Sequence, residues 1–237
     1  MSKNTLENLR KEIERLKNPA KAKILAGFFK TGKEEYGAGD KFFGIVVPKQ
    51  RELVKKYWKE MEISEILKLL KSLYHEERLI ALLLLVKKFE VGDEKERKII
   101  FEAYLKNTKY INNWDLVDLS APNIVGMYLA DKDRKILYQL ARSKDLWEKR
   151  IAILATFQFI KNKESNDALK ISEMLLQDKH DLIHKAVGWM LREVGKRCSV
   201  EEEEKFLQKY YKIMPRTMLR YAIERFPEKK RQKYLIK

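Results

Sequence analysis

The stretch Leu182-Ile-His-Lys-Ala-Val-Gly188 decides the fold, because its pattern of a basic residue followed by an apolar segment with a small residue returns at a fixed interval. It can be aligned with His75-Glu-Glu-Arg-Leu-Ile-Ala81, Trp147-Glu-Lys-Arg-Ile-Ala-Ile153 and Thr217-Met-Leu-Arg-Tyr-Ala-Ile223. The basic residues are separated by 72, 35 and 35 positions, and they are Arg78, Arg150, Lys185 and Arg220.

The first interval spans two periods, and its midpoint falls on Trp114, which opens the helical segment Trp114-Asp-Leu-Val-Asp118. A helix-pair unit of about 35–37 residues is typical of helical solenoids, whose units bury their apolar faces by stacking on their neighbours. The Trp/Gly/Tyr pattern of tetratricopeptide repeats is not visible. We therefore predict an all-α protein, a right-handed α-solenoid of about six HEAT-like repeats that forms a single domain over residues 1–237.

The composition agrees with this prediction and indicates the cellular compartment. The chain has 237 residues with only nine Gly and five Pro, which fall at points that punctuate the helical pattern, such as Pro19, Gly92 and Pro122. A lone cysteine, Cys198, cannot form an internal disulfide, which favours a reducing compartment. The longest apolar run, Leu79 to Val86, is too short to span a bilayer, and the polar start Met1 to Lys17 does not resemble a leader. We expect a cytoplasmic protein with no membrane partner.

The charge balance indicates a polyanionic partner. Lys and Arg number 51 against 35 Asp and Glu, which gives a net charge of +16. Each contact with a phosphate releases condensed counterions and favours binding. A Lys-rich proteome, in which Lys and Glu decorate every solvated face, is the alternative reading. Basic residues at one register of a solenoid would line one surface, which we expect to be concave and suited to duplex DNA.

Two positions break the repeat pattern. Trp114 replaces the basic residue of its unit, and Asp118 lies one helical turn further on the same face. The equivalent positions four residues after the basic slot elsewhere are Leu82, Leu154, Trp189 and Glu224. The register thus predicts a face that bears Trp114, Asp118, Arg150 and Trp189, flanked by Lys185 and Arg192.

A carboxylate in a positive groove repels phosphate but stabilises a developing cation. N-glycosidic cleavage passes through an oxocarbenium-like state, which a fixed carboxylate stabilises while it orients the attacking water. Indoles supply an electron-rich face for a cationic sugar or base. Structural interpretations are also open at this point: Trp114 as core, Asp115 and Asp118 as helix-capping charges, and Arg150 as the partner of a nearby Glu.

Metal binding is not favoured by the sequence. His180 and His184 have the spacing of metal ligands on a helix, but His-Asp-Leu-Ile-His lacks the internal Glu of zinc peptidases, and His75 is the one remaining histidine. We find no Gly-rich phosphate loop, no Gly-x-Ser-x-Gly elbow and no Cys cluster. We expect no metal and no cofactor.

Four stretches resemble the signatures of one family, the AlkD family of HEAT-like DNA glycosylases of alkylation repair. The similarity extends from about residue 5 to residue 230. The middle two of the motifs are specific, and we find no other family that carries both. They are Asn113-Trp-Asp-Leu-Val-Asp-Leu-Ser-Ala-Pro122, Leu146-Trp-Glu-Lys-Arg-Ile-Ala-Ile-Leu154, Lys185-Ala-Val-Gly-Trp-Met-Leu-Arg-Glu193 and Phe43-Gly-Ile-Val-Val-Pro-Lys-Gln-Arg51.

The resemblance implies a monofunctional enzyme that excises cationic 3-methyladenine and 7-methylguanine from duplex DNA and leaves an abasic site without base flipping, unlike most base-processing enzymes. It implies Asp118 as the catalytic carboxylate, Trp114 and Trp189 as the groove-lining indoles, and Arg150 as the arginine that contacts the backbone near the lesion. Arg192 would contact a further phosphate. We expect Lys185, Arg220 and Phe28 to add DNA contacts, and the protein to act as a monomer.

The chain departs from the family pattern at two places. A Tyr on the N-terminal helices of some members corresponds here to Phe28 or Phe29, which lack the hydroxyl, and a Trp that precedes the first indole in some members is Asn113. Relatives without the carboxylate only bind DNA structures. A non-enzymatic binder of damaged or branched DNA, and a HEAT scaffold that binds acidic peptides, are therefore the alternative functions.

Overall fold

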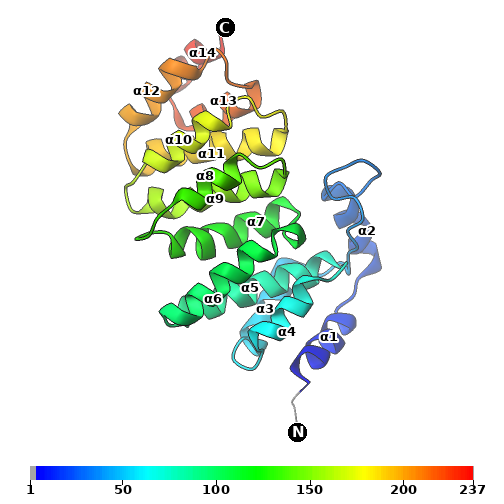
Figure 1. Cartoon of the computed structure of the whole chain (residues 1–237). Helices are drawn as coiled ribbons and strands as arrows, with labels where there is room; N and C mark the ends of the chain where they lie inside the picture. Colours follow the sequence, from blue (N-terminus) through cyan, green and yellow to red (C-terminus); the bar gives the residue numbers. More distant parts are fainter. Residues whose placement is uncertain (1–3, 237) are drawn as a thin grey trace. The chain divides into compact units, whose positions relative to one another are not determined.

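A computed structural model describes residues 4–236, and every regular element in this range is a helix. The all-α class predicted from the sequence is thus confirmed. The number and handedness of the repeats stay predictions. The α-helices are α1 (Thr5–Arg15), α2 (Pro19–Phe28), α3 (Val47–Tyr57), α4 (Ile63–Leu70), α5 (His75–Val91), α6 (Glu94–Lys106), α7 (Trp114–Ala121), α8 (Lys135–Ala141), α9 (Leu146–Lys161), α10 (Asn166–Met174), α11 (Asp181–Arg197), α12 (Val200–Tyr210), α13 (Arg216–Ala222) and α14 (Glu228–Leu235) (Figure 1).

Three short helical segments complete the set: the 3-10 helices η1 (Thr108–Tyr110) and η3 (Ile223–Arg225), and a π-helical turn η2 (Pro122–Gly126). The chain divides into two compact units, an N-terminal unit that ends at Ser120 and a C-terminal unit that begins at Ala121. The single domain predicted over residues 1–237 stays a prediction. Within residues 4–236, no helix is long and apolar enough to cross a membrane.

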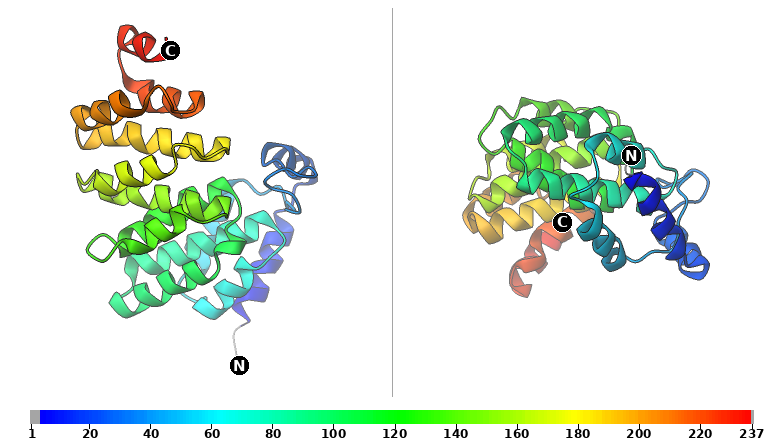
Figure 2. Two further views of the ribbon diagram at one scale, coloured as in Figure 1. Left: turned by 45° about the horizontal axis from the view of Figure 1, so that its top comes forward. Right: turned by 90° about the horizontal axis from the view of Figure 1, so that it is seen from below.

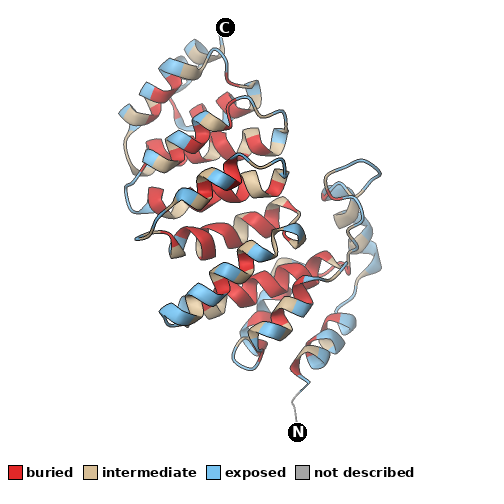
Figure 3. Ribbon diagram, in the orientation of Figure 1, coloured by how far each residue is buried: buried red, intermediate tan, exposed pale blue. Residues whose placement is uncertain are grey.

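The N-terminal unit is built around α5, which packs against α3, α4 and α6. The apolar run from Leu79 to Val86 lies on this helix, and each of its residues is at most 9% exposed. A helix that is apolar on all sides is stable only when other helices surround it. The run that is too short to span a bilayer is therefore the centre of the unit's core (Figure 3).

In the C-terminal unit, helices that carry the repeated pattern pack directly on one another. α11 packs against α9 on one side and α13 on the other, as the 35-residue spacing of their basic residues predicts. Within this unit, successive helices stack in the order of the chain (Figure 2). Gly188 sets the closeness of one contact, since a Cβ there would lie 2.4 Å from the Met218 carbonyl oxygen.

Candidate active site

The helix α7 places Trp114 and Asp118 on the wall of one pocket in the N-terminal unit. Trp114 is its first residue and Asp118 lies one turn later, so that the two side chains share a face, as the sequence predicts. Both are half-buried. The pocket has a volume of about 380 Å³, and its lining is mainly apolar: Leu25, Phe28, Phe29, Phe42, Ile45, Val46, Val47, Gln50, His75, Glu76, Leu79, Trp114, Asp115, Asp118 and Leu119.

Stacked rings form one side of this pocket. Phe29 stacks on Trp114 with 5.3 Å between ring centroids, and it stacks on Phe42 at the same distance. The His75 imidazole lies against both phenylalanines, 4.6 Å from Phe29 and 4.8 Å from Phe42. We call these four residues, Trp114, Phe29, Phe42 and His75, the aromatic wall. Each ring is held by another ring, so the wall has little freedom to rearrange.

Phe28 has a different position from its neighbour Phe29. Its ring packs edge-on against Trp114 at 5.9 Å, and the residue is 61% exposed, whereas Phe29 is 7% exposed. An exposed apolar ring beside a pocket costs solvation free energy in the free protein, which favours a role in contact with a ligand. Of the two candidates for the family's tyrosine position, Phe28 is the one whose ring faces solvent.

A loop without regular structure supplies Phe42 and Ile45 to the pocket, and one buried carboxylate holds it. Glu76, 1% exposed, accepts hydrogen bonds from the backbone N–H groups of Phe43, Gly44 and Ile45 at 3.0, 2.8 and 3.1 Å. These bonds offset the cost of burying the charge. Gly44 has φ +86°, and a Cβ there would lie 2.1 Å from the Asn18 carbonyl oxygen, so the loop also needs a glycine.

Beneath the aromatic wall lies a buried polar cluster that the sequence analysis did not identify. His75 Nε2 is 2.8 Å from Asp115 Oδ2, and its Nδ1 is 3.4 Å from Asp40 Oδ2. The Arg78 guanidinium lies 2.7 Å from the same Asp40 oxygen. Arg78 was expected among the basic residues of an exposed surface, but it is 3% exposed and serves this cluster instead. That expectation is wrong for Arg78.

The cluster favours a charged imidazole. Burial opposes the charge of His75, but its hydrogen bonds to Asp115 and Asp40 outweigh burial and raise its pKa above the ordinary value. Burial also opposes the charge of Asp40, yet the hydrogen bond from His75 and the nearby Arg78 lower its pKa. The signal available in the sequence was the position of His75 at the start of a helix, which spacing alone could not connect to Asp115, forty residues later.

A second buried contact fixes the end of α7. Tyr104 on α6 is fully buried, and its hydroxyl lies 2.8 Å from the Ser120 Oγ, two residues after Asp118. Burial raises the pKa of Tyr104, and the nearby charge of Asp118 acts in the same direction although the Ser120 hydrogen bond opposes it. Thus α7 is held near its start by His75 and near its end by Tyr104, with Asp118 between these two points.

The predicted site residues of the C-terminal unit differ in exposure. Arg150 is 5% exposed, and its Nη1 donates a hydrogen bond to the Leu182 carbonyl oxygen near the start of α11. The basic register therefore does not form a continuous exposed surface, because two of its members, Arg78 and Arg150, are buried in polar contacts. The role of Arg150 toward DNA stays a prediction.

The other four predicted residues of this unit are at least partly accessible. Trp189 is half-buried, with its ring 6.0 Å from that of Phe157. Lys185 forms an ion pair with Asp181 at 2.7 Å, Arg192 is ion-paired with Glu224, and Arg220 is exposed. These ion pairs are surface pairs, which a phosphate can displace at small cost.

His180 and His184 are engaged with the backbone around the start of α11. The His180 Nδ1 accepts a hydrogen bond from the Leu182 N–H at 3.1 Å, and the His184 Nε2 bonds to the Asp178 carbonyl oxygen. Burial lowers the pKa of His180 despite nearby Asp178, which fits a neutral acceptor at a helix N-cap. Within residues 4–236 no group of three His, Cys, Asp or Glu side chains is arranged to hold a metal ion.

The pocket of the N-terminal unit combines a half-buried carboxylate with an apolar, aromatic surround. In such surroundings water screens charge poorly, so Asp118 attracts a positive centre more strongly than it would on an open surface. Indole and phenyl faces attract cations through their quadrupoles. The arrangement can therefore bind and stabilise a flat or cationic group.

Comparison with known proteins gives two findings. A family model described as DNA alkylation repair enzyme matches residues 9–226. Among solved structures, the chain is similar to a predicted DNA alkylation repair enzyme from Enterococcus faecalis, with a TM-score of 0.69 and 17% identity, over 90% of this chain and 97% of that one. At this identity the likeness concerns the fold. No curated protein matches the chain.

Proposed function

Since this chain belongs to the DNA alkylation repair enzyme family, whose name denotes a role in DNA repair, we propose that it is a monofunctional DNA glycosylase. Its substrates are cationic purines alkylated at N3 or N7, chiefly 3-methyladenine and 7-methylguanine in duplex DNA. The observation that carries the proposal is that Asp118 and Trp114 line one mainly apolar pocket. Family membership supports DNA as the partner.

In the proposed reaction, a water oxygen forms a bond to C1′ of the deoxyribose as the C1′–N bond breaks. The electron pair of that bond stays with the purine and cancels its positive charge, so the base leaves neutral and needs no acid. Asp118 stabilises the oxocarbenium-like state and accepts a proton from the attacking water, which then passes to solvent. The base is not flipped out of the duplex.

The remaining predicted residues act through contact with DNA. Trp114 offers an indole face to the lesion nucleotide, and the exposed ring of Phe28 extends that surface. In the C-terminal unit we assign Trp189 to the lesion nucleotide as well. The basic residues assigned to backbone phosphates are Arg150, Lys185, Arg192 and Arg220.

The test is release of 7-methylguanine from methylated duplex DNA by wild type and by Asp118→Asn. We expect the variant to lose release by at least about 100-fold, the order seen when one electrostatic contact to a transition state is removed. Its affinity for duplex DNA should be equal or higher, because a charge that repels phosphate is gone. Asp131→Asn, at an exposed position, is the matched control and should keep full activity.

Three outcomes would contradict this proposal in different ways. Full activity of Asp118→Asn would remove the carboxylate from the chemistry. Binding of methylated duplex by wild type without any base release would make the protein a non-enzymatic binder. A weak dependence of duplex affinity on salt would instead favour a protein-interaction scaffold, because each neutralised phosphate contributes about −0.9 to the slope against log salt.

A further inference from the structure

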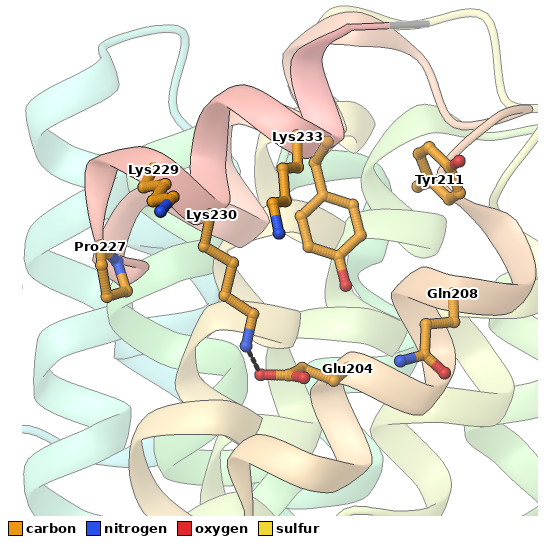
Figure 4. A pocket seen from close by; sticks show the side chains of 8 residues that line it. Glu204, Gln208, Tyr211, Pro227, Lys229, Lys230 and Lys233 are labelled. Atoms are coloured by element: carbon orange, nitrogen blue, oxygen red, sulfur yellow. Dashed lines mark hydrogen bonds and ion pairs between the residues drawn. The ribbon is translucent and has the colours of Figure 1, made fainter.

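A second cavity, of about 510 Å³, lies in the C-terminal unit between α12 and α14 (Figure 4). Its size falls within the range of roughly 300–1,000 Å³ that small-molecule sites occupy. None of its eight described lining residues has a role predicted from the sequence. The wall formed by α14 also begins at Glu228, beyond the last residue that the family model matches.

Contacts on both sides of α14 hold this cavity in shape. The ring of Tyr234 packs edge-on against Tyr211 at 5.4 Å and lies 5.9 Å from Phe226. Arg216 Nη1 donates to the Leu235 carbonyl oxygen at 2.6 Å. Lys230 is ion-paired with Glu204 on α12, which joins the two helices directly. The cavity is open to solvent, and its two walls are held together by these contacts.

The cavity carries a surplus of positive charge. Lys229, Lys230 and Lys233 line it, and Glu204 is the one acidic residue among its eight lining residues. Glu204 neutralises Lys230, so two charges of the three remain. The side chains of Lys230 and Lys233 extend from α14 towards α12, where Gln208 adds an amide that can donate and accept (Figure 4). The ammonium groups of Lys229 and Lys233, together with this amide, suit a phosphate.

Two phenol rings provide the apolar part of the cavity. Tyr211 and Tyr234 line it and are both half-buried. Burial raises the pKa of Tyr234, and nearby Glu203 and Tyr211 act in the same direction, so the phenol stays neutral and can donate a hydrogen bond. A nucleobase can stack on an aromatic side chain whatever its identity, because every base has a π-face.

We propose that this cavity binds one nucleotide unit, with its phosphate on Lys229 and Lys233 and its base against Tyr211 and Tyr234. The shared chemistry of a free nucleotide and of an unpaired nucleotide in a DNA strand is a phosphate joined through a sugar to a flat heterocycle. Both have the anion and the ring that the lysines and the tyrosines recognise. The site is separate from the proposed base-release chemistry, and its test does not depend on that reaction.

The experiment is calorimetric titration of the full chain with adenosine 5′-monophosphate, adenosine and ribose 5-phosphate, followed by a thymidine tetranucleotide. We expect the monophosphate to bind at least about tenfold more tightly than adenosine or ribose 5-phosphate, because each of these lacks one recognised half. A tetranucleotide that binds more tightly than the monophosphate identifies a DNA strand as the source, and the reverse order identifies a free nucleotide.

The variant Lys229→Gln/Lys233→Gln assigns the binding to this cavity. Both side chains are exposed, so the variant should keep the unfolding midpoint of wild type and lose affinity for the monophosphate by about tenfold. Lys170→Gln, an exposed lysine on α10 outside the cavity, is the matched control and should bind as wild type does. Unchanged affinity in the double variant, no binding of the monophosphate by wild type, or equal affinity for ribose 5-phosphate would each overturn the proposal.

Discussion

His75 Nε2 lies 2.8 Å from Asp115 Oδ2, and both side chains are nearly inaccessible to solvent. Asp115 is the second residue of α7, so the contact fixes the first turn of the helix that carries Trp114 and Asp118. The same imidazole stacks on Phe29 and Phe42. One side chain thus connects the aromatic wall of the pocket to the helix that bears the proposed catalytic carboxylate.

Removal of this histidine should change the pH dependence of stability. Because the folded-state pKa of His75 is raised above its ordinary 6.5, its contribution is complete below about pH 6.5 and is lost as pH rises through the folded value. His75→Gln leaves the buried Asp115 without its charged partner and leaves Asp40 with Arg78 as its charged partner. The variant should cost roughly 3 kcal/mol at low pH, with a smaller loss at high pH. Urea unfolding from about pH 5.5 to about pH 9 measures this difference. An equal loss across that range would contradict the proposed charge on His75.

A buried glutamate in the C-terminal unit should make stability depend on pH over a range that begins lower than that of His75. Burial raises the pKa of Glu203 from 4.5 to about 8, although Lys230 and Arg192 act against it. The unfolded chain releases this proton near pH 4.5, so stability falls as pH rises from there through the folded value. Glu203→Gln should remove that fall and be about 2 kcal/mol more stable than wild type near pH 8. Glu204→Gln is the control: it should retain the fall, and a flat profile in both variants would count against Glu203.

The two adjacent phenylalanines should separate binding from folding. Phe28 is 61% exposed, so Phe28→Ala should change the free energy of unfolding by less than about 0.5 kcal/mol yet lower base release by about tenfold. Phe29 is buried in the aromatic wall, so Phe29→Ala should lower the free energy of unfolding by about 3–5 kcal/mol. Phe28→Tyr would restore the hydroxyl found in some relatives and should keep full release. If Phe28→Ala kept full release, the exposed ring would have no role toward DNA.

Arg150 should have a measurable part in stability as well as in DNA binding. Arg150→Ala leaves the Leu182 carbonyl oxygen without this donor and should destabilise the C-terminal unit by about 2–3 kcal/mol. If Arg150 also contacts a phosphate, the slope of log affinity against log salt should change by about one unit. Exposed Arg220→Ala is the comparison, with the same change in slope and less than about 0.5 kcal/mol in stability. A normal slope for Arg150→Ala would make its role structural.

The all-helical class and the contacts among α9, α11 and α13 could be predicted from the sequence, because a repeat must place equivalent residues on neighbouring helices. The shared face of Trp114 and Asp118 was also predictable, since it depends on a spacing of four residues within one helix. Local periodicity suffices for relationships of this kind.

The cluster of Asp40, His75, Arg78 and Asp115 was not predictable in the same way. Its members come from a loop and two helices, and each is an ordinary polar residue in its local context. Burial was equally hidden: Arg78 and Arg150 share the register of Lys185 and Arg220, yet the first two are buried and Arg220 is exposed. Whether an arginine faces solvent depends on carbonyl or carboxylate partners that packing brings near, which sequence spacing does not reveal.

The carboxylate of Glu76 has a consequence for how the pocket responds to a ligand. It receives three consecutive amide hydrogens from a loop that has no regular structure, and all three are buried. Such amides exchange with solvent only when the surrounding core opens, so this segment should exchange as slowly as the centre of α5. A wall that is already ordered loses little conformational entropy when a ligand arrives, and more of the contact energy is then expressed as affinity.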